Sequence, residues 1–324
     1  LPMGDYLFSV VKRRVYETFN EYLFPSKSKT GHLVEPVKQV RKVAEISGVD
    51  LSASFPEEIL SEIVQAFADH SVLLFRDQNL NDEAQVAFSQ RIGPLERSFV
   101  DNLGKNRAEI ADLSNIDKDE QLLKKGSDRD LFLSGNRRWH TDGSFKIVPS
   151  LGSALSAREI PQDGGETEFA DMRSAYDALD DAMKRRIDKL TVEHSFLYSQ
   201  GKIGIGYMTD EEKASVPPVR HPMVRSHPES GRKAIYAGRH ASHVIGMPME
   251  QGRALIQELN EFATQPQFVH RHHWRAGDLV LWDNRMVMHR GLPYDDTKFR
   301  RIMHRTTLAG QAEKNPWVVN EKVA

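Results

Sequence analysis

The chain has 324 residues, of which 39% are hydrophobic and 28% charged, and its net charge is −2. This composition is typical of a globular protein that can bury a core, lacks the basic excess of nucleic-acid-binding proteins, and includes no apolar run of membrane-spanning length. With no cysteines and 13 histidines, disulfides and thiolate chemistry are excluded, so histidine and carboxylate must hold any metal. We recognise no secretory signal and predict a cytoplasmic location.

The first predicted element is an amphipathic helix over residues 5–24. Its apolar residues recur at intervals of three and four, which draws one stripe along a helix. The stripe could pack on the main body, on a partner subunit or on a membrane surface, and we favour protein packing because the polar face is not strongly basic. Residues 25–32 are typical of a flexible link. We therefore predict a helical arm and linker at 1–34, a main domain at 35–324, and a homo-oligomer.

The main domain begins with helices and continues with strands. A helix is predicted over 55–70 with Ser54 as its N-cap, a buried strand over 71–76, and a second helix after Asn81. From Trp139 onward, alternating apolar residues and turn residues dominate, with two helices between the strands. The predicted strands lie near 153–158, 234–238, 267–274 and 278–282, and the helices near 172–190 and 249–264. This pattern indicates a mostly β fold with flanking helices, a barrel or a sandwich.

The motif with the most chemical content is WHTD at 139–142. Residues i and i+2 of an extended segment point to the same face, so His140 and Asp142 can reach one ion. A third ligand must come from elsewhere, and His289, just beyond an apolar strand, is the best candidate. Two imidazoles and one carboxylate form the facial triad of non-haem Fe(II) oxygenases, which leaves coordination positions open. Taken alone, the His-x-Asp triplet is a weak signal, because such triplets arise by chance and a histidine is more often a hydrogen-bonded polar residue than a metal ligand.

A cationic anchor for a co-substrate carboxylate follows the distal histidine. Arg301 and Arg305 lie four residues apart on a predicted strand and therefore share a face. Arginine binds a carboxylate through two parallel hydrogen bonds, and the hydroxyl of Thr167 could bind the same group. The alternative is a solvated basic strand. The remaining histidines that we considered are interpreted as surface or partly buried residues rather than ligands: His221, His227, His270, His272 and His273.

Together, these residues resemble the 2-oxoglutarate-dependent dioxygenases of the taurine/2,4-D dioxygenase (TauD/TfdA) family, and most closely its 2,4-dichlorophenoxyacetate dioxygenase branch. The family pattern is His-x-Asp, a Thr, a distal His and an Arg at set spacings. Here Thr167 lies 25 residues after Asp142, and Arg301 lies 12 residues after His289. Further stretches that resemble this branch are GGETEFADMRSAYDAL at 164–179, GRKAIYAGRHASHVIG at 231–246 and DLVLWDNRMVMHRG at 278–291. The likeness covers about residues 45–310 and excludes the N-terminal helix.

The resemblance implies a double-stranded β-helix, a jelly-roll or cupin-like barrel, with ferrous iron between its sheets. Carried over to this sequence, it makes His140, Asp142 and His289 the iron ligands. It also implies that Thr167 and Arg301 bind the distal carboxylate of 2-oxoglutarate.

Four further residues match family positions near the co-substrate and the substrate. Asn136 matches an asparagine near 2-oxoglutarate. Arg305 matches an arginine that meets the anionic group of the substrate in relatives. His240 and His243 match a segment that can line the substrate pocket, although packing explains these two equally well.

The reaction implied by the resemblance is hydroxylation of a small carboxylate-bearing, aryloxyacetate-like substrate by O2, with release of succinate and CO2. If the hydroxylated carbon bears an ether oxygen, the product is a hemiacetal that collapses, and the enzyme cleaves the ether. One alternative is a taurine-like sulfonate dioxygenase, or a hydroxylase of another anionic metabolite, on the same scaffold. Another is a barrel that binds a ligand or structural metal without turnover. A zinc hydrolase is a third, in which Arg301 and Thr167 would have no role.

Overall fold

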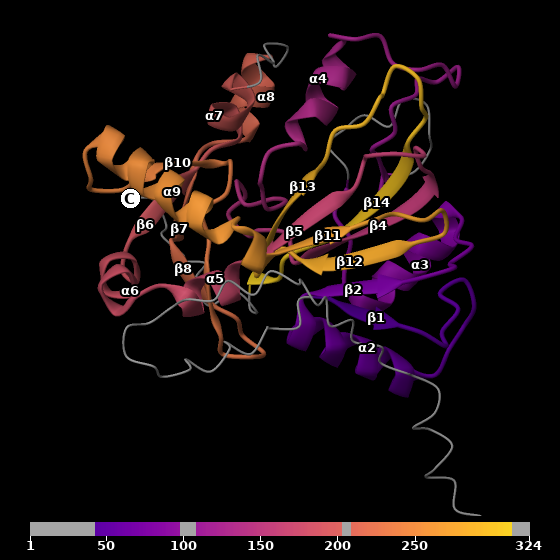
Figure 1. The fold of residues 1–324 in the computed structure, drawn as a ribbon, viewed down its shortest axis with the longest axis horizontal. Helices are drawn as coiled ribbons and strands as arrows, with labels where there is room; N and C mark the ends of the chain where they lie inside the picture. The colour runs from indigo at the N-terminus through magenta and orange to yellow at the C-terminus, as the bar shows by residue number, and fades with distance from the viewer. Residues whose placement is uncertain (1–42, 98–107, 203–208, 313–324) are drawn as a thin grey trace, which may run out of the picture.

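The computed structural model describes residues 43–97, 108–202 and 209–312 (Figure 1). The predicted N-terminal helix, the linker and the domain boundary between residues 34 and 35 lie outside this part of the chain. The described residues form sheets with helices around them, which confirms the mostly β class predicted from the sequence.

A six-stranded sheet forms one layer of the structure (Figure 1). Its strands are β1 (Ala44–Ile46), β2 (Val72–Phe75), β3 (Ala111–Asp112), β4 (Gly152–Glu159), β12 (Leu279–Asp283) and β14 (Ile302–Leu308). They lie in the order β1-β2-β12-β4-β14-β3. β1 and β2 run parallel, and the other neighbours are antiparallel. Leu281 lies opposite Leu73 on one side and Ala154 on the other, so apolar side chains pack side by side across β2, β12 and β4 on this face of the sheet.

A smaller antiparallel sheet shares a core with the large one. Its strands are β5 (Thr167–Asp171), β11 (Val269–His272) and β13 (Val287–Gly291), in the order β11-β5-β13. A buried apolar cluster contains Phe169 and Val287 from this sheet together with Leu155, Trp282 and Met303 from the large sheet. Strands from both sheets therefore enclose a common core, and the functional site lies among their ends.

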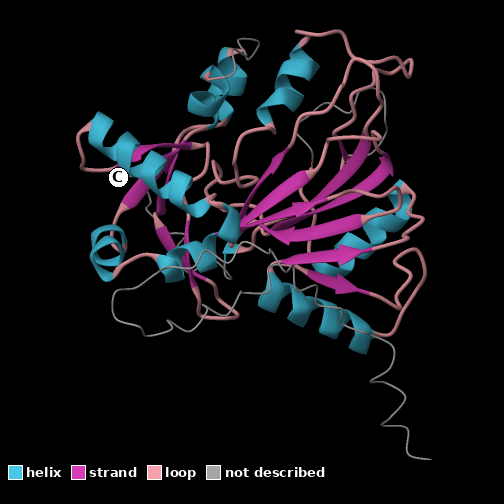
Figure 2. Ribbon diagram, viewed as in Figure 1, coloured by secondary structure: helices cyan, strands magenta, loops and turns pink. Residues whose placement is uncertain are grey.

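A second group of strands builds the other half of the described structure, on the left in Figure 2. Its strands are β6 (Thr191–His194), β7 (Val219–Pro222), β8 (Val224–Ser226), β9 (Lys233–Ile235) and β10 (Ala241–Val244). They form the sheet β10-β6-β7 and the pair β8-β9. The helices α5 (Met172–Ala178) and α9 (Met249–Ala263) pack on them. One buried cluster joins Tyr176, Ile235 and Leu255 of this group to Met288 of β13, which ties it to the strand that carries His289.

Helices α2 (Glu57–His70) and α3 (Asp82–Ile92) lie against the six-stranded sheet. Ile63 and Phe88 share a buried cluster with Leu281 of β12. The side chain of Asn81 caps α3, as predicted, by accepting a hydrogen bond from the backbone N–H of Ala84 at 2.8 Å. The remaining helices are α4 (Asp128–Gly135), α6 (Asp181–Ile187), α7 (Phe196–Gly201), α8 (Asp210–Ser215) and the 3-10 helix η1 (Pro266–Phe268).

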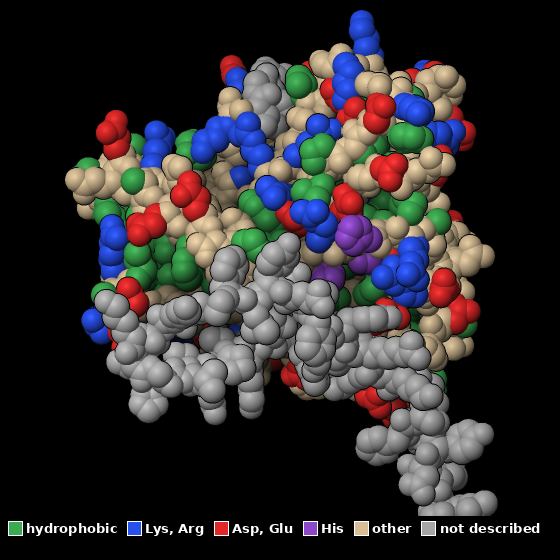
Figure 3. Space-filling view, in the orientation of Figure 1, with side chains coloured by type: hydrophobic (Ala, Val, Ile, Leu, Met, Phe, Trp, Pro, Cys, Tyr) green, Lys and Arg blue, Asp and Glu red, His purple; other side chains and the backbone are tan. Residues whose placement is uncertain are grey.

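Two global features agree with the composition. On the face seen in Figure 3, basic and acidic side chains are interspersed, in line with the near-neutral net charge. Within the described ranges, no helix has both the length and the apolar character needed to cross a membrane.

The helix predicted over 172–190 is in fact two helices, so this prediction was wrong. The backbone is extended at Leu179, which ends α5. Asp180 then starts α6, because its side chain accepts a hydrogen bond from the backbone N–H of Met183 at 2.7 Å. A local cap thus outweighs the continuous helical periodicity.

Two other predicted boundaries also differ. Ser54 does not cap α2, because Pro56 occupies the N-cap position and the helix begins at Glu57. The strand predicted over 267–274 starts with the end of η1 and pairs as a strand only from Val269 to His272.

Candidate active site

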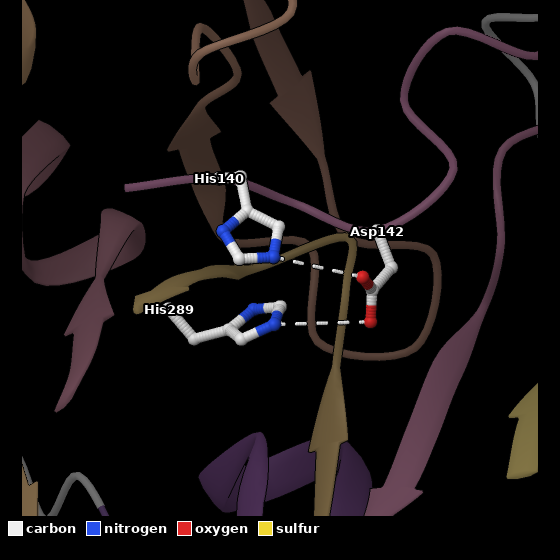
Figure 4. Close-up of side chains that lie close together, drawn as sticks. All are labelled: His140, Asp142 and His289. Atoms are coloured by element: carbon white, nitrogen blue, oxygen red, sulfur yellow. Dashed lines mark ion pairs between the residues drawn. The ribbon is translucent and has the colours of Figure 1, made fainter. Parts of the chain in front are cut away.

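Two histidines and one aspartate from distant parts of the chain meet in the structure (Figure 4). His140 and Asp142 flank Thr141 in a loop before β4, and His289 lies on β13. Nε2 of His140 is 3.8 Å from Oδ1 of Asp142, and Nε2 of His289 is 3.8 Å from Oδ2. One donor atom from each residue lies within 4.8 Å of the others. The three side chains therefore converge as ligands of a single ion would.

The backbone fixes the two histidines relative to each other. The N–H of His140 donates to the carbonyl of His289 at 3.0 Å, and the N–H of His289 donates back at 2.8 Å. The ring centroids are 4.2 Å apart. Directly after Asp142 the chain turns at Gly143, which has φ of +65° and contacts Ser150 so closely that a side chain would not fit.

Both imidazoles are held in the neutral form that binds metal ions. Nδ1 of His140 lies 2.7 Å from the carbonyl of Arg138 and donates to it, which leaves Nε2 free toward Asp142. Burial, followed by the proximity of His289, with which it could not share a second proton, and the charge of Arg239, lowers the pKa of His140 well below its usual range. Burial likewise lowers the pKa of His289 to about 4, although the charge of Asp142 acts in the opposite direction.

Asp142 is ionised and held from two sides. Ser153 donates to its Oδ2 at 2.8 Å, and Nη1 of Arg305 donates to its Oδ1 at 2.9 Å. Burial alone would raise the pKa of Asp142, but the charge of Arg305, the two histidines and the Ser153 hydrogen bond together lower it. An ionised carboxylate facing two neutral imidazoles is a donor set that fits ferrous iron.

The residues predicted to anchor a co-substrate also fit a carboxylate. Nε of Arg301 donates to the carbonyl of Gly165 at 3.2 Å, and within the described ranges no carboxylate forms an ion pair with this arginine. Burial lowers the pKa of Arg301 to about 10, so it remains cationic at neutral pH. The Thr167 hydroxyl accepts a hydrogen bond from Nε1 of Trp274 at 3.0 Å, which leaves its own hydrogen available. A partly buried cation without an ion-pair partner and a free hydroxyl hydrogen are what an incoming carboxylate requires.

One pocket connects the ligand cluster to this anchor. Its walls include side chains from α4, β4, β12, β13 and β14. Because the anchor and the two histidines open into the same pocket, one small molecule can contact both. The predicted site residues that line it are Asn136, His140, Thr167, His289, Arg301 and Arg305.

The structure places the other two predicted substrate residues outside this pocket lining. The buried His240 ring lies 5.0 Å from the Phe145 ring and 6.2 Å from the Phe196 ring, centroid to centroid. Burial lowers the pKa of His240 to about 3. Nδ1 of His243 lies 2.9 Å from Oγ of Ser242 and 3.7 Å from a carboxylate oxygen of Glu193. A substrate role for either histidine stays a prediction.

Two histidines interpreted as non-ligands at the surface or partly buried are in fact buried, each in a hydrogen bond to a carboxylate. Nε2 of His227 lies 3.0 Å from Asp283, and Nε2 of His272 lies 3.0 Å from Asp278. In the part of the chain that the structure describes, the group of His140, Asp142 and His289 alone has the spacing of a metal site.

Sequence reasoning missed two residues that border the site. Asn115 holds the backbone of Arg301, because its Oδ1 accepts the Arg301 N–H at 2.7 Å. No sequence signal marks this asparagine, which lies in an irregular stretch. Arg239 donates to the carbonyl of Gly135 and has no carboxylate partner among the described residues. Arg239 could have been predicted as a site residue, because it precedes His240 in the stretch 231–246 that resembles the family.

Comparisons with known proteins agree with this geometry. Residues 34–307 match the family described as taurine catabolism dioxygenase TauD, TfdA family. An alpha-ketoglutarate-dependent 2,4-dichlorophenoxyacetate dioxygenase from Cupriavidus pinatubonensis is 41% identical, over 82% of this chain and 94% of the relative. An (S)-phenoxypropionate/alpha-ketoglutarate-dioxygenase from Sphingobium herbicidovorans is 38% identical, over 82% and 91%. The crystal structure of AAD-2 in complex with Mn(II) and N-oxalylglycine matches with a TM-score of 0.77 and 44% identity, over 83% and 94%.

These matches extend over most of the chain and confirm the likeness drawn from the motif spacing. The chain is thus an alpha-ketoglutarate-dependent dioxygenase and belongs to the TauD, TfdA family.

Proposed function

We propose that this enzyme uses Fe(II), 2-oxoglutarate and O2 to hydroxylate small aryloxyalkanoates at the carbon beside the ether oxygen. The hydroxylated product would be a hemiacetal, which collapses to a phenol and an oxo acid. The names of two relatives specify 2,4-dichlorophenoxyacetate and (S)-phenoxypropionate, which are acids of this class. The observation that carries the proposal is that Arg301 and Arg305 line one pocket with His140 and His289, so two anions can bind beside the ligand cluster.

The roles of individual residues are part of this proposal. The convergence of three donor atoms within 4.8 Å supports a single metal ion. The neighbour AAD-2 holds Mn(II) and N-oxalylglycine, a dicarboxylate with the same oxalyl and terminal carboxylate groups as 2-oxoglutarate. We infer that His140, Asp142 and His289 hold iron, that Thr167, Arg301 and Asn136 bind 2-oxoglutarate, and that Arg305, with His240 or His243, binds the substrate.

Iron and 2-oxoglutarate, when bound, supply the activation of O2, and 2-oxoglutarate leaves as succinate and CO2. The protein binds and orients the reactants. Arg301 and Thr167 can hold the distal carboxylate by charge-assisted hydrogen bonds, which fixes one end of the co-substrate. Leu155 and Trp282 form apolar walls of the same pocket and exclude water from the reacting groups.

Arg305 has two partners in this scheme. In the structure its guanidinium bonds Asp142. Once the Asp142 carboxylate shares its charge with a metal ion, the arginine has charge and N–H groups available for a substrate carboxylate. This shared position would place the carboxylate of the substrate close to the metal-binding residues.

The finer structural predictions belong to the same proposal. We propose that the six-stranded and three-stranded sheets together form a double-stranded β-helix, a reading supported by their common core. The cytoplasmic location, the homo-oligomeric state and the division at residues 34 and 35 stay predictions from the sequence.

The test is a substrate panel read as stimulated succinate release under Fe(II) and 2-oxoglutarate. Phenoxyacetates and phenoxypropionates should stimulate release strongly, and their methyl esters, which lack the charge, should stimulate it at least tenfold less. Taurine and other sulfonates serve as the competing class. Stronger stimulation by sulfonates, or equal stimulation by acid and ester, would contradict the aryloxyalkanoate assignment.

A further inference from the structure

A buried hydrogen-bond relay holds Oδ2 of Asp142, the carboxylate oxygen that Arg305 does not bond. Asn284 Oδ1 accepts hydrogen bonds from Nε1 of Trp282 at 2.9 Å and from the backbone N–H of Asp142 at 3.3 Å. Asn284 Nδ2 donates to Oγ of Ser153 at 3.1 Å, and Ser153 donates to Oδ2 of Asp142 at 2.8 Å. The exposed fraction of Ser153 is 0% and that of Asn284 is 1%, so water does not compete for these bonds.

The donor and the acceptor of each hydrogen bond in this relay can be assigned, because two of its groups can only donate. Trp282 Nε1 and the backbone of Asp142 can only donate, so the atom of Asn284 that faces them must be its oxygen. The amide nitrogen therefore points to Ser153 and donates to it. Since a serine hydroxyl has a single hydrogen, Ser153 must direct that hydrogen to Asp142. The amide of Asn284 thus sets which way the Ser153 hydroxyl points.

The side chain of Asn284 is not required to shape its own loop. The backbone N–H of Asn284 bonds the carbonyl of Leu151 at 2.9 Å. The side chain of Asp283 accepts hydrogen bonds from the backbone N–H and the guanidinium of Arg285 at 2.7 to 3.2 Å. The loop is therefore held by groups other than the Asn284 amide, whose bonds all lead to Asp142, Ser153 or Trp282.

The relay matters because a carboxylate can bind a metal ion through one oxygen or two. The proposed reaction needs three open positions, two for 2-oxoglutarate and one for O2. If both oxygens of Asp142 bound the ion, one of those positions would be lost. The Ser153 hydrogen bond ties Oδ2 to β4, so a rotation of the carboxylate into two-oxygen binding would have to break this bond.

We propose that Ser153 and Asn284 are positioning residues that confine Asp142 to one-oxygen binding and so keep the O2 position open. This inference rests on the proposed function, in which Asp142 is an iron ligand. Neither residue touches the reactants. Ser153 acts through Asp142, and Asn284 acts through Ser153 and through the Asp142 backbone.

The experiment uses the full-length protein loaded anaerobically with Fe(II) and 2-oxoglutarate, with nitric oxide as the probe for the O2 position. Binding of 2-oxoglutarate is followed by its charge-transfer absorption, and nitric oxide binding by the electron paramagnetic resonance signal of the iron–nitrosyl complex. The variants are Ser153→Ala, Asn284→Ala and the double variant. Ser156→Ala is the matched control, because Ser156 is buried on the same strand but faces the opposite way.

Partners of metal ligands typically contribute about 10- to 100-fold to metal affinity or activity. We therefore expect nitric oxide affinity to fall at least tenfold in Ser153→Ala, while 2-oxoglutarate affinity changes less than twofold. Asn284→Ala should lose at least as much, and the double variant should match Asn284→Ala because the two residues act in series. Ser153→Ala deletes a single oxygen atom, so it keeps the test decisive if Asn284→Ala fails to fold.

Two results would overturn the inference in different ways. Unchanged nitric oxide affinity in Ser153→Ala, or an equal loss in Ser156→Ala, would refute the positioning role and leave the proposed function intact. An unmodified protein that binds Fe(II) and 2-oxoglutarate without a charge-transfer band would overturn the proposed function together with the inference.

Discussion

Replacing Arg301 by Gln should weaken 2-oxoglutarate binding strongly while leaving the free protein at least as stable. Arg301 is a partly buried cation without a carboxylate partner among the described residues, and desolvation lowers its pKa to about 10. An unpaired cation of this kind lowers the free energy of unfolding as long as no anion is bound to it. A shorter, neutral amide removes that cost in the free protein and removes the ionic contact in the complex.

The magnitude follows from the contacts that remain. Truncating one partner of a buried charge pair typically costs about 2–5 kcal/mol. The lower end applies here, because Thr167, whose hydroxyl hydrogen is available, can still bind the carboxylate. A loss of about 2 kcal/mol corresponds to about 30-fold in the dissociation constant. At saturating 2-oxoglutarate, the stabilisation that the ligand confers should fall by the same amount, about 2 kcal/mol.

The assay combines titration of 2-oxoglutarate with thermal unfolding, with and without the co-substrate. Arg300→Gln is the matched control, because Arg300 is the adjacent residue and is partly exposed in an ion pair with Glu159 at 3.1 Å. That variant should bind 2-oxoglutarate within twofold of the unmodified protein. The reasoning about an unpaired, partly desolvated cation is refuted if Arg301→Gln binds 2-oxoglutarate normally, or if it destabilises the free protein by more than Arg300→Gln does.

Three further predictions address the metal, the substrate and the pH dependence. His140→Ala should bind less than a tenth of the iron of the unmodified protein, measured by metal analysis, while its circular dichroism spectrum is retained; full iron content would contradict the ligand assignment. Arg305→Ala should raise the substrate concentration for half-maximal succinate release at least tenfold for an aryloxyacetate and much less for its methyl ester, and a loss equal for both would argue against a carboxylate contact. Burial lowers the pKa of His221 to about 3, so between its ordinary pKa near 6.5 and that value only the unfolded state binds the proton, and stability falls as the pH drops through this window. In the metal-free protein, His221→Gln should therefore reduce the difference in unfolding free energy between pH 7.5 and pH 5 by about 2 kcal/mol, and identical pH profiles would count against this origin.

Local geometry explains why much of the site was predictable. His140 and Asp142 needed only the rule that alternate residues of an extended segment share a side, and the structure brings both to His289. The prediction that Arg301 and Arg305 share a face rested on the same rule, and both residues line the pocket. These predictions depend on neighbours in sequence and on the family spacing, both of which can be read from the chain.

Contacts that depend on loop geometry or strand pairing could not be predicted in this way. Ser153 reaches Asp142 because the turn at Gly143 brings the loop back to β4, and Trp274 reaches Thr167 because the register of β11 and β5 brings distant segments together. A slip of one residue would turn these side chains to the opposite face. The single helix predicted over 172–190 was wrong for another reason. The side chain of Asp180 caps a new helix there, and this local cap outweighs the long helical periodicity.

The reciprocal backbone pairing of His140 and His289 has a consequence for how the protein matures. The partners lie almost half the chain apart, and contacts of such long range form slowly, since a large loop must close before they are made. On the ribosome, β13 emerges after most of the domain has been synthesised. The nascent chain thus cannot display a complete metal site early, and iron must be acquired after synthesis is nearly finished. Metal uptake during refolding should therefore lag behind the formation of the helices and report the closure of the loop between His140 and His289.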